Sequence, residues 1–275
     1  MKITVRHEAD PAFAPLVPRL VAVAATTVPL VDSITGLALP DEVVIRTMTV
    51  DHWIRAHENR FVERLHEEVQ QLGIPRRSTL MPRIKRRAAI IGMRTLWPLM
   101  MGQAVEFAAG QPELVILPDA LKHAGVFDDD RLLHKLLAHE TTHLAQYAAS
   151  DGEVWAMQET EFPRLRDTAD RAYGALLEGH AYWADREITT KIFGEPVTTN
   201  EISPLASEKY RKLIAGRAIK RVNGAFVQGT AEVTQIIAEL GLSAFNCVWT
   251  RPDLVPLKPE IGNPGLWPQR FTLSY

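Results

Sequence analysis

The sequence has a single cysteine, no long uninterrupted apolar run and no excess of charge of one sign. Cys247, alone among 275 residues, excludes an intramolecular disulfide and a zinc site built from cysteines. The first eight residues have no apolar signal core. The apolar stretch from Leu20 to Val31 is too short and too interrupted to span a bilayer. We therefore expect a cytoplasmic protein.

Composition and charge narrow the classes of partner. The chain has 46% apolar and 23% charged residues and a formal net charge of −2, which is typical of an ordinary soluble globular protein. No nucleic-acid or membrane partner is expected from this balance. Basic residues cluster at Arg76-Arg77 and from Arg83 to Arg87, and we interpret them as the solvated start of a helix. The sequence does not indicate an oligomeric state.

The segment His139-Glu140-Thr141-Thr142-His143 is an HExxH motif, and no glycine or proline occurs from Asp128 to Ser150. Residues four apart on a helix lie on one face, so both imidazoles can bind one Zn²⁺ ion. Glu140 points away from the axis joining the two histidines, and it is better placed to deprotonate a water than to bind the metal. The alternative is a polar helix face with two ordinary histidines.

A zinc site of this type needs a third protein ligand, and Glu178 is the best candidate. It lies in a predicted helix from about Thr168 to Ile192, where small residues on its face would let another helix approach: Gly174, Ala175 and Ala181. Asp185 follows two turns later and suits an acceptor for a ligand imidazole N–H. Tyr182 could donate its phenol to a developing oxyanion. The alternative for Glu178 is an exposed acid on an amphipathic helix.

The remaining histidines fit the site less well. His180 is about 200° around the helix from Glu178 and cannot easily share its metal, and His134 lies off the face of His139 and His143. His123 is expected in a loop. Three further histidines occur on a charged helix, where they are more often solvated or locally paired than ligands: His52, His57 and His66.

At these positions the sequence resembles the zincin-like metallopeptidases of the gluzincin type. It is more closely similar to an uncharacterised group of zinc-dependent hydrolases found mainly in actinobacteria. The similarity rests on the HExxH motif, on Leu177-Glu178-Gly179-His180-Ala181 with Asp185, and on scattered C-terminal matches, and it covers roughly residues 110 to 270. These matches include Tyr210, Gly216, Phe226, Phe245-Asn246-Cys247-Val248-Trp249, Pro252, Glu260-Ile261, Pro264, Trp267 and Arg270.

The resemblance implies that His139, His143 and Glu178 are zinc ligands and that Glu140 is the general base. Two departures stand out. Gluzincins of the thermolysin sort have an aspartate four residues after the ligand glutamate, where this chain has Tyr182. Members of the group are also longer, so the first hundred residues here would be a trimmed or replaced cap.

The expected fold class is mainly α (α+β), zincin-like, with a helical body and a small β-sheet beside the HExxH helix. Residues 1–100 would form an N-terminal cap and residues 101–275 the zincin-like catalytic region with a proline-rich tail, or the two would form one unit. Strands are predicted at 1–7, 42–48 and 113–117, and helices at 51–73, 82–107, 203–223 and 230–240. The strand Glu113–Leu117 is the candidate wall of the cleft and could pair with an extended substrate, or it is a buried structural strand.

The sequence therefore predicts a zinc-dependent hydrolase, most simply a metallopeptidase acting on a peptide or protein. Zn²⁺ would lower the pKa of a water that Glu140 deprotonates, and Tyr182 or Tyr210 would help to polarise the carbonyl. Two alternatives remain open. One is a non-catalytic scaffold or binding protein with the zincin fold, and the other is a zinc amidohydrolase acting on a small-molecule amide.

Overall fold

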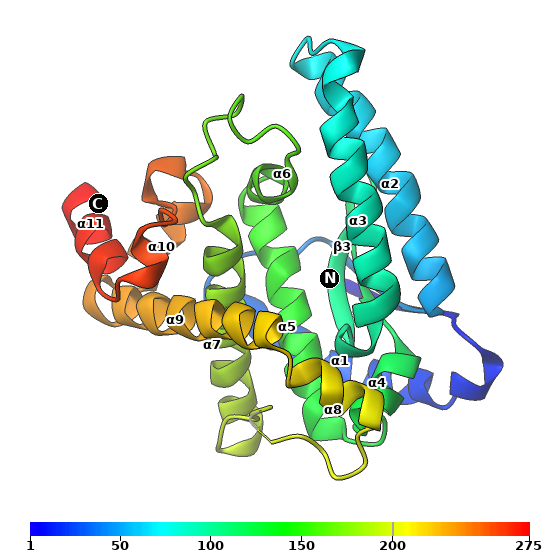
Figure 1. Ribbon diagram of the computed structural model, residues 1–275. Coiled ribbons are helices and arrows are strands. Elements are labelled where there is room, and N and C mark those ends of the chain that lie inside the picture. The colour runs from blue at the N-terminus through cyan, green and yellow to red at the C-terminus, as the bar shows by residue number, and fades with distance from the viewer. Residues whose placement is uncertain (200) are drawn as a thin grey trace.

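The fold is built around a mixed four-stranded sheet with helices on both sides (Figure 1). The computed structural model describes residues 1–199 and 201–275, without the side chains of residues 76, 77, 218, 222 and 223. The expected solvation of the Arg76-Arg77 side chains lies outside these described residues. Most of the described chain is helical, which confirms the α+β class.

The strands are β1 (Lys2–Glu8), β2 (Glu42–Met48), β3 (Gly102–Ala108) and β4 (Gln111–Ile116). They lie in the order β1-β2-β4-β3, in which β1, β2 and β4 are parallel and β3 is antiparallel to β4. Alternate side chains of a strand point to opposite faces. Leu114 and Ile116 accordingly pack into the larger core cluster, whereas Val115 packs into a smaller one on the other face.

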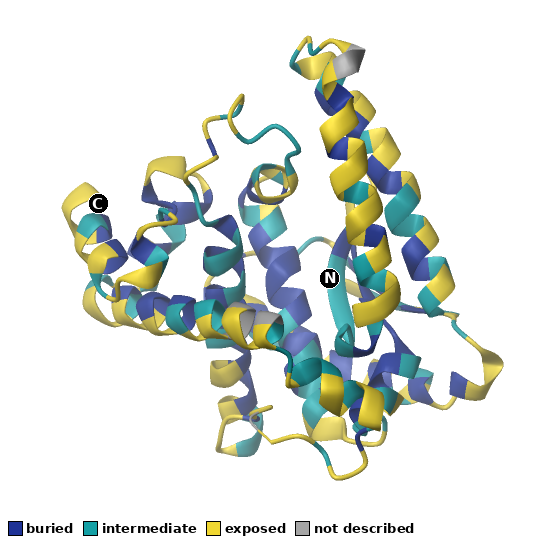
Figure 2. Ribbon diagram, in the orientation of Figure 1, coloured by how far each residue is buried: buried dark blue, intermediate teal, exposed yellow. Residues whose placement is uncertain are grey.

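Eleven helices of the described residues surround the sheet. Their bounds are α1 Leu16–Thr35, α2 Val50–Gln71, α3 Leu80–Leu96, α4 Pro118–Ala124, α5 Asp130–Ala149, α6 Glu153–Glu159, α7 Tyr173–Phe193, α8 Glu208–Ile214, α9 Arg217–Leu240, α10 Leu242–Asn246 and α11 Leu266–Ser274. The larger core joins one sheet face to α1, α5, α7 and α9, and the smaller core joins the other face to α2 and α3. Figure 2 shows α5 mostly buried, whereas the α2–α3 hairpin projects with one exposed side. Both sheet faces are thus covered.

Helix α1 is, within the described residues, the one helix long and apolar enough to cross a membrane by length and composition. It is longer than the run from Leu20 to Val31 on which the sequence argument rested. A core helix passes the same test, and one face of α1 packs on α5 and α7 in the larger core.

Two segments differ from the prediction. The helix expected over 82–107 ends at Leu96, where a short 3₁₀ turn (Trp97–Leu99) leads into β3. The helix expected over 203–223 is two helices, because Gly216 has an extended backbone that separates α8 from α9. The proline-rich tail contains the helix α11, and its residues Trp249 and Trp267 are buried in the core.

Strands β1 and β2, from the first hundred residues, share one sheet with β3 and β4. The division into a cap and a catalytic region remains a prediction.

Candidate metal centre

Helix α5 presents the two motif histidines. Its first turn is capped by Asp129, whose side chain accepts a hydrogen bond from the backbone N–H of Leu132 at 3.0 Å. The helix then runs through the protein between the sheet and α7, and its residues from Leu137 to Gln146 are almost all buried. A long capped helix held in the core gives the histidines a fixed direction.

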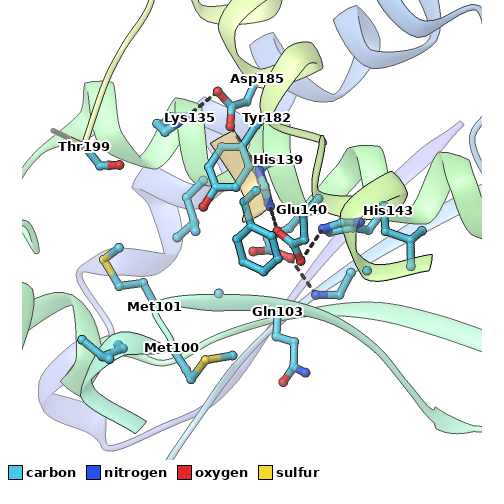
Figure 3. Close-up of a pocket in the computed structure, with 18 of the residues that line it drawn as sticks. Met100, Met101, Gln103, Lys135, His139, Glu140, His143, Tyr182, Asp185 and Thr199 are labelled. Carbon is cyan, nitrogen blue, oxygen red and sulfur yellow. Dashed lines mark hydrogen bonds and ion pairs between the residues drawn. The ribbon is translucent and has the colours of Figure 1, made fainter. Parts of the chain in front are cut away.

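His139, His143 and Glu178 meet between α5 and α7, and Figure 3 shows the two histidines with Glu140 beside them. His139 Nε2 lies 3.3 Å from one carboxylate oxygen of Glu178, and His143 Nε2 lies 3.8 Å from the other. One donor atom from each residue lies within 4.8 Å of the others. Two imidazole nitrogens and a carboxylate oxygen at this separation could bind a single metal ion.

The second nitrogen of His139 is fixed by a buried ion pair. Its Nδ1 lies 3.1 Å from Asp185 Oδ2, and the other oxygen of Asp185 accepts a hydrogen bond from Lys135 Nζ at 2.5 Å. Because a carboxylate only accepts, His139 Nδ1 carries the proton. In the neutral ring, Nε2 therefore has its lone pair directed toward Glu178 and the candidate site.

His143 is oriented by a buried amide. The Nε2 amide group of Gln146 donates to the backbone carbonyl of Leu177 at 3.0 Å, so Gln146 Oε1 is the group that faces His143 Nδ1 at 2.8 Å. This oxygen can only accept, and it places the proton of the His143 ring on Nδ1. His143 Nε2 is thereby left with a free lone pair at the site. In their neutral forms, both histidines hence have the tautomer that metal binding requires.

The pKa values of the site reflect burial and neighbouring charge. Burial alone would lower the pKa of His139, but its hydrogen bonds to Asp185 and Glu178 outweigh this and raise it to about 10. Burial raises the pKa of the Glu140 carboxyl, against the pull of the two histidines. A raised pKa is the direction that a carboxylate acting as a general base requires.

Glu140 is oriented by β3. Its Oε2 accepts a hydrogen bond from the backbone N–H of Ala104 at 2.8 Å. The strand approaches α5 closely because Gly102 has no side chain, since a Cβ there would lie 2.9 Å from Leu136 Cδ1 and 3.2 Å from Glu140 Cγ. The glycine therefore allows the strand to hold the carboxylate beside the histidines.

A cavity of about 480 Å³ opens over these residues. Residues 102–104 of β3 form one wall, and Leu136 is one of the apolar lining residues. Met101 is another (Figure 3). The prediction that the strand Glu113–Leu117 forms the wall of the cleft and pairs with substrate is wrong. β4 is hydrogen-bonded on both sides by β2 and β3, so it cannot pair with a substrate, and the strand beside the site is β3.

The small residues near Glu178 act differently from the expectation. The carbonyl of Ala175 and the neighbouring Gly179 meet α9, and Gly174 lies beside Gln158 of α6. A Cβ on Gly179 would lie 2.6 Å from the carbonyl carbon of Gly229, and a Cβ on Gly229 would lie 2.6 Å from Ala175 O. Helices α7 and α9 therefore cross in backbone contact. This crossing brings α9 residues such as Phe226 to the cavity.

The two candidate tyrosines are placed differently. Tyr182 lines the cavity, and its ring centroid lies 4.6 Å from that of His139, roughly edge to face. Tyr210 is on α8 and is not among the described residues that line the cavity, although it is near enough to Tyr182 to raise the pKa of that phenol. A catalytic role for either tyrosine stays a prediction.

The other histidines are engaged elsewhere. His180 is fully buried against Phe245 and Trp249, and Gln146 lies 3.0 Å from its Nδ1. His134 bonds Thr27. His123 lies in α4 and not in the expected loop, and its ring forms a hydrogen bond with Ser207.

Two positioning residues were missed from the sequence. They are Gln146, which bonds His143, and Lys135, which bonds the Asp185 carboxylate that orients His139. Gln146 follows His143 by three residues and Lys135 precedes His139 by four, so both lie one turn from a ligand on the same helix. Polar side chains at that spacing were the available signal.

No protein-family model and no curated protein matches the chain. Among solved structures, the chain is similar to the crystal structure of "a putative hydrolase with a novel fold" from Chloroflexus aurantiacus, with a TM-score of 0.61 and 20% sequence identity. The match covers 96% of this chain and 92% of that chain. At this identity the likeness shows a common fold. The zincin-like fold remains a prediction, and the donor set of the site neither requires nor excludes it.

Proposed function

We propose that the protein is a zinc-dependent hydrolase and, most specifically, a metallopeptidase. The observation that carries the proposal is the grouping of His139, His143 and Glu178 around one point, with Glu140 beside them in a cavity. Two neutral imidazoles and one carboxylate match the ligand set of catalytic zinc sites that keep an open position. The hydrolase description of the structurally similar protein points in the same direction.

When bound, zinc would polarise a carbonyl and lower the pKa of water. Glu140 would accept the proton of the attacking water and deliver it to the leaving nitrogen. The Ala104 N–H holds one oxygen of this carboxylate, so the other remains available for the water. The Tyr182 phenol, whose pKa is raised by burial, would stay protonated and donate a hydrogen bond to the carbonyl oxygen.

The cavity volume keeps a second candidate open. About 480 Å³ lies within the range of roughly 300–1,000 Å³ that suits small-molecule sites. A small-molecule amide would therefore fit as well as a short stretch of peptide. In both cases the chemistry at Glu140 would be the same, and only the substrate would differ.

The first test is metal content. Protein purified without chelator should contain about one zinc per chain, and His139→Ala should lose it, whereas His66→Ala, at an exposed histidine on α2, should keep it. A metal-free wild-type protein would refute the proposal.

The second test is turnover. Glu140→Gln should keep the zinc but lose hydrolysis by at least about a hundredfold, whereas Glu187→Gln, at an exposed position on α7, should retain full activity. A library of fluorogenic peptides and small acyl amides distinguishes the two substrate classes. A zinc-loaded protein that hydrolyses neither class would favour the non-catalytic alternative.

A further inference from the structure

The outer face of α3 has an apolar ridge. Leu80, Ile84 and Ile91 are 63%, 52% and 60% exposed. On a helix with about 100° of rotation per residue, these three side chains fall within about 40° of one another. The ridge therefore extends along most of a helix about 25 Å long. Three large aliphatic side chains aligned on one exposed helix face form an apolar patch, which differs from singly scattered surface residues.

Basic residues border this ridge. Arg83, Arg87 and Arg94 fall on a second line along one flank, and Lys85 lies on the other; all four are exposed. The helix contains five basic and no acidic residues. Among the described residues, Arg83, Lys85 and Arg87 form no ion pair, and Arg94 lies 3.8 Å from Glu58. The ridge is thus bordered by basic residues, of which Lys85 lies near Glu161 and Arg94 near Glu58, whereas Arg83 and Arg87 have no acidic partner among the described residues.

The opposite face of α3 is already used for folding. Ile90 packs into the smaller core with Trp53 and Ile54 of α2. Arg86, the fifth basic residue, turns inward, where its guanidinium lies 4.9 Å from the Phe61 ring centroid. The hairpin of α2 and α3 projects from the body, and α3 presents its exposed side to solvent (Figure 2). The ridge is therefore accessible and not required for the contact with α2.

We propose that the outer face of α3 binds the surface of an anionic lipid bilayer. A helix with an apolar face and flanking Lys and Arg residues can lie in the headgroup region, with its aliphatic side chains inserted and its cations against acidic lipids. A second copy of the chain fits less well. Packing two such ridges together would bring two sets of arginines side by side, and α3 has no carboxylate to neutralise them.

The chain connects this face to the cavity. Only three residues of 3₁₀ turn separate α3 from Met100, and Leu99, Met100 and Met101 line the cavity. The C-terminal end of α3 therefore leads directly into the lining of the candidate active site. The net charge of −2 conceals this local concentration of positive charge, and the expectation of no membrane partner rested on that overall balance.

The test is sedimentation with vesicles of phosphatidylcholine alone and of phosphatidylcholine mixed with phosphatidylglycerol. The full chain should bind only the mixed vesicles, and high salt should release it because surface charge is screened. Ile84→Glu/Ile91→Glu should weaken binding by at least about tenfold. Leu205→Glu/Leu273→Glu is the matched control, since it places the same two charges at residues that are 80% and 89% exposed elsewhere.

Far-ultraviolet circular dichroism and thermal unfolding of each variant exclude misfolding as a cause of lost binding. Arg83→Gln/Arg87→Gln is a second variant, which removes two basic residues and leaves the apolar ridge intact. The proposal is overturned if the wild-type protein ignores the mixed vesicles, if it binds both vesicles equally, or if both glutamate variants bind like the wild type. A wild-type dimer that Ile84→Glu/Ile91→Glu converts to a monomer would instead identify a second copy as the occupant. None of these outcomes depends on hydrolysis.

Discussion

Replacing Gln146 by leucine should weaken both metal binding and folding. The side chain is fully buried and joins three groups: His143 Nδ1 at 2.8 Å, the Leu177 carbonyl at 3.0 Å and His180 Nδ1 at 3.0 Å. Leucine has a similar size but cannot form these hydrogen bonds. The Leu177 carbonyl lies within α7 and keeps its helical hydrogen bond. The groups left without a hydrogen-bond partner are therefore the Nδ1 atoms of His143 and His180.

A buried polar group left without a partner costs about 1–3 kcal/mol. Two ring nitrogens therefore predict a loss of about 2–6 kcal/mol in the free energy of unfolding. The loss of zinc affinity should be about 10- to 100-fold, the usual effect of removing the partner of a metal-binding histidine. Gln146→Glu should lose stability but keep most of the zinc affinity, because its carboxylate can still accept the proton of His143 Nδ1.

Urea unfolding of the metal-free protein measures the first quantity, and competition with a chromophoric chelator measures the second. Gln235→Leu is the matched control, because Gln235 is exposed on α9 and its amide donates a hydrogen bond to Glu239. If Gln146→Leu binds zinc as tightly as the wild-type protein, then the amide does not set the His143 tautomer and the reasoning is wrong.

Three further predictions follow from buried groups. Burial lowers the pKa of His180 to about 3, so the unfolded chain takes up a proton near pH 6.5 that the folded protein does not. Urea unfolding should therefore show that the free energy of unfolding falls by about 2 kcal/mol between pH 6.5 and about 5 because of His180. This fall should be absent in His180→Gln. Because the metal-free protein holds a proton on His139 up to a pKa of about 10, chelator competition should show zinc affinity rising about tenfold per pH unit near neutrality, and a flat profile would contradict the assignment. Gly229→Ala should lower the stability measured by thermal unfolding by about 1–3 kcal/mol, because the new Cβ would meet Ala175 O. Gly224→Ala, in open space on the same helix, should instead raise the stability by up to about 1 kcal/mol. Equal effects of the two substitutions would argue against a tight crossing of α7 and α9.

The local part of the candidate site could be predicted from the sequence. His139, Glu140 and His143 lie within five residues of one helix, and the absence of glycine and proline around them fixed their relative directions. Glu178 and Asp185 were also placed on one face of a second helix, and the structure brings both to His139. Helical periodicity is a local property, so it needs no knowledge of the fold.

Contacts between elements could not be predicted in this way. Nothing local indicates that β3 lies at the sheet edge beside α5, that Gly179 meets Gly229, or that Gln146 links His143 to a carbonyl of α7, because each depends on how distant segments pack. The basic residues of α3 were visible in the sequence, but only the packing of Ile90 and Arg86 against α2 shows which side of that helix remains exposed. The sequence by itself thus determined the donor atoms of a possible metal centre. The tertiary structure decided their partners, the wall of the cavity and the outward face of α3, since burial and close approach arise only when the elements assemble.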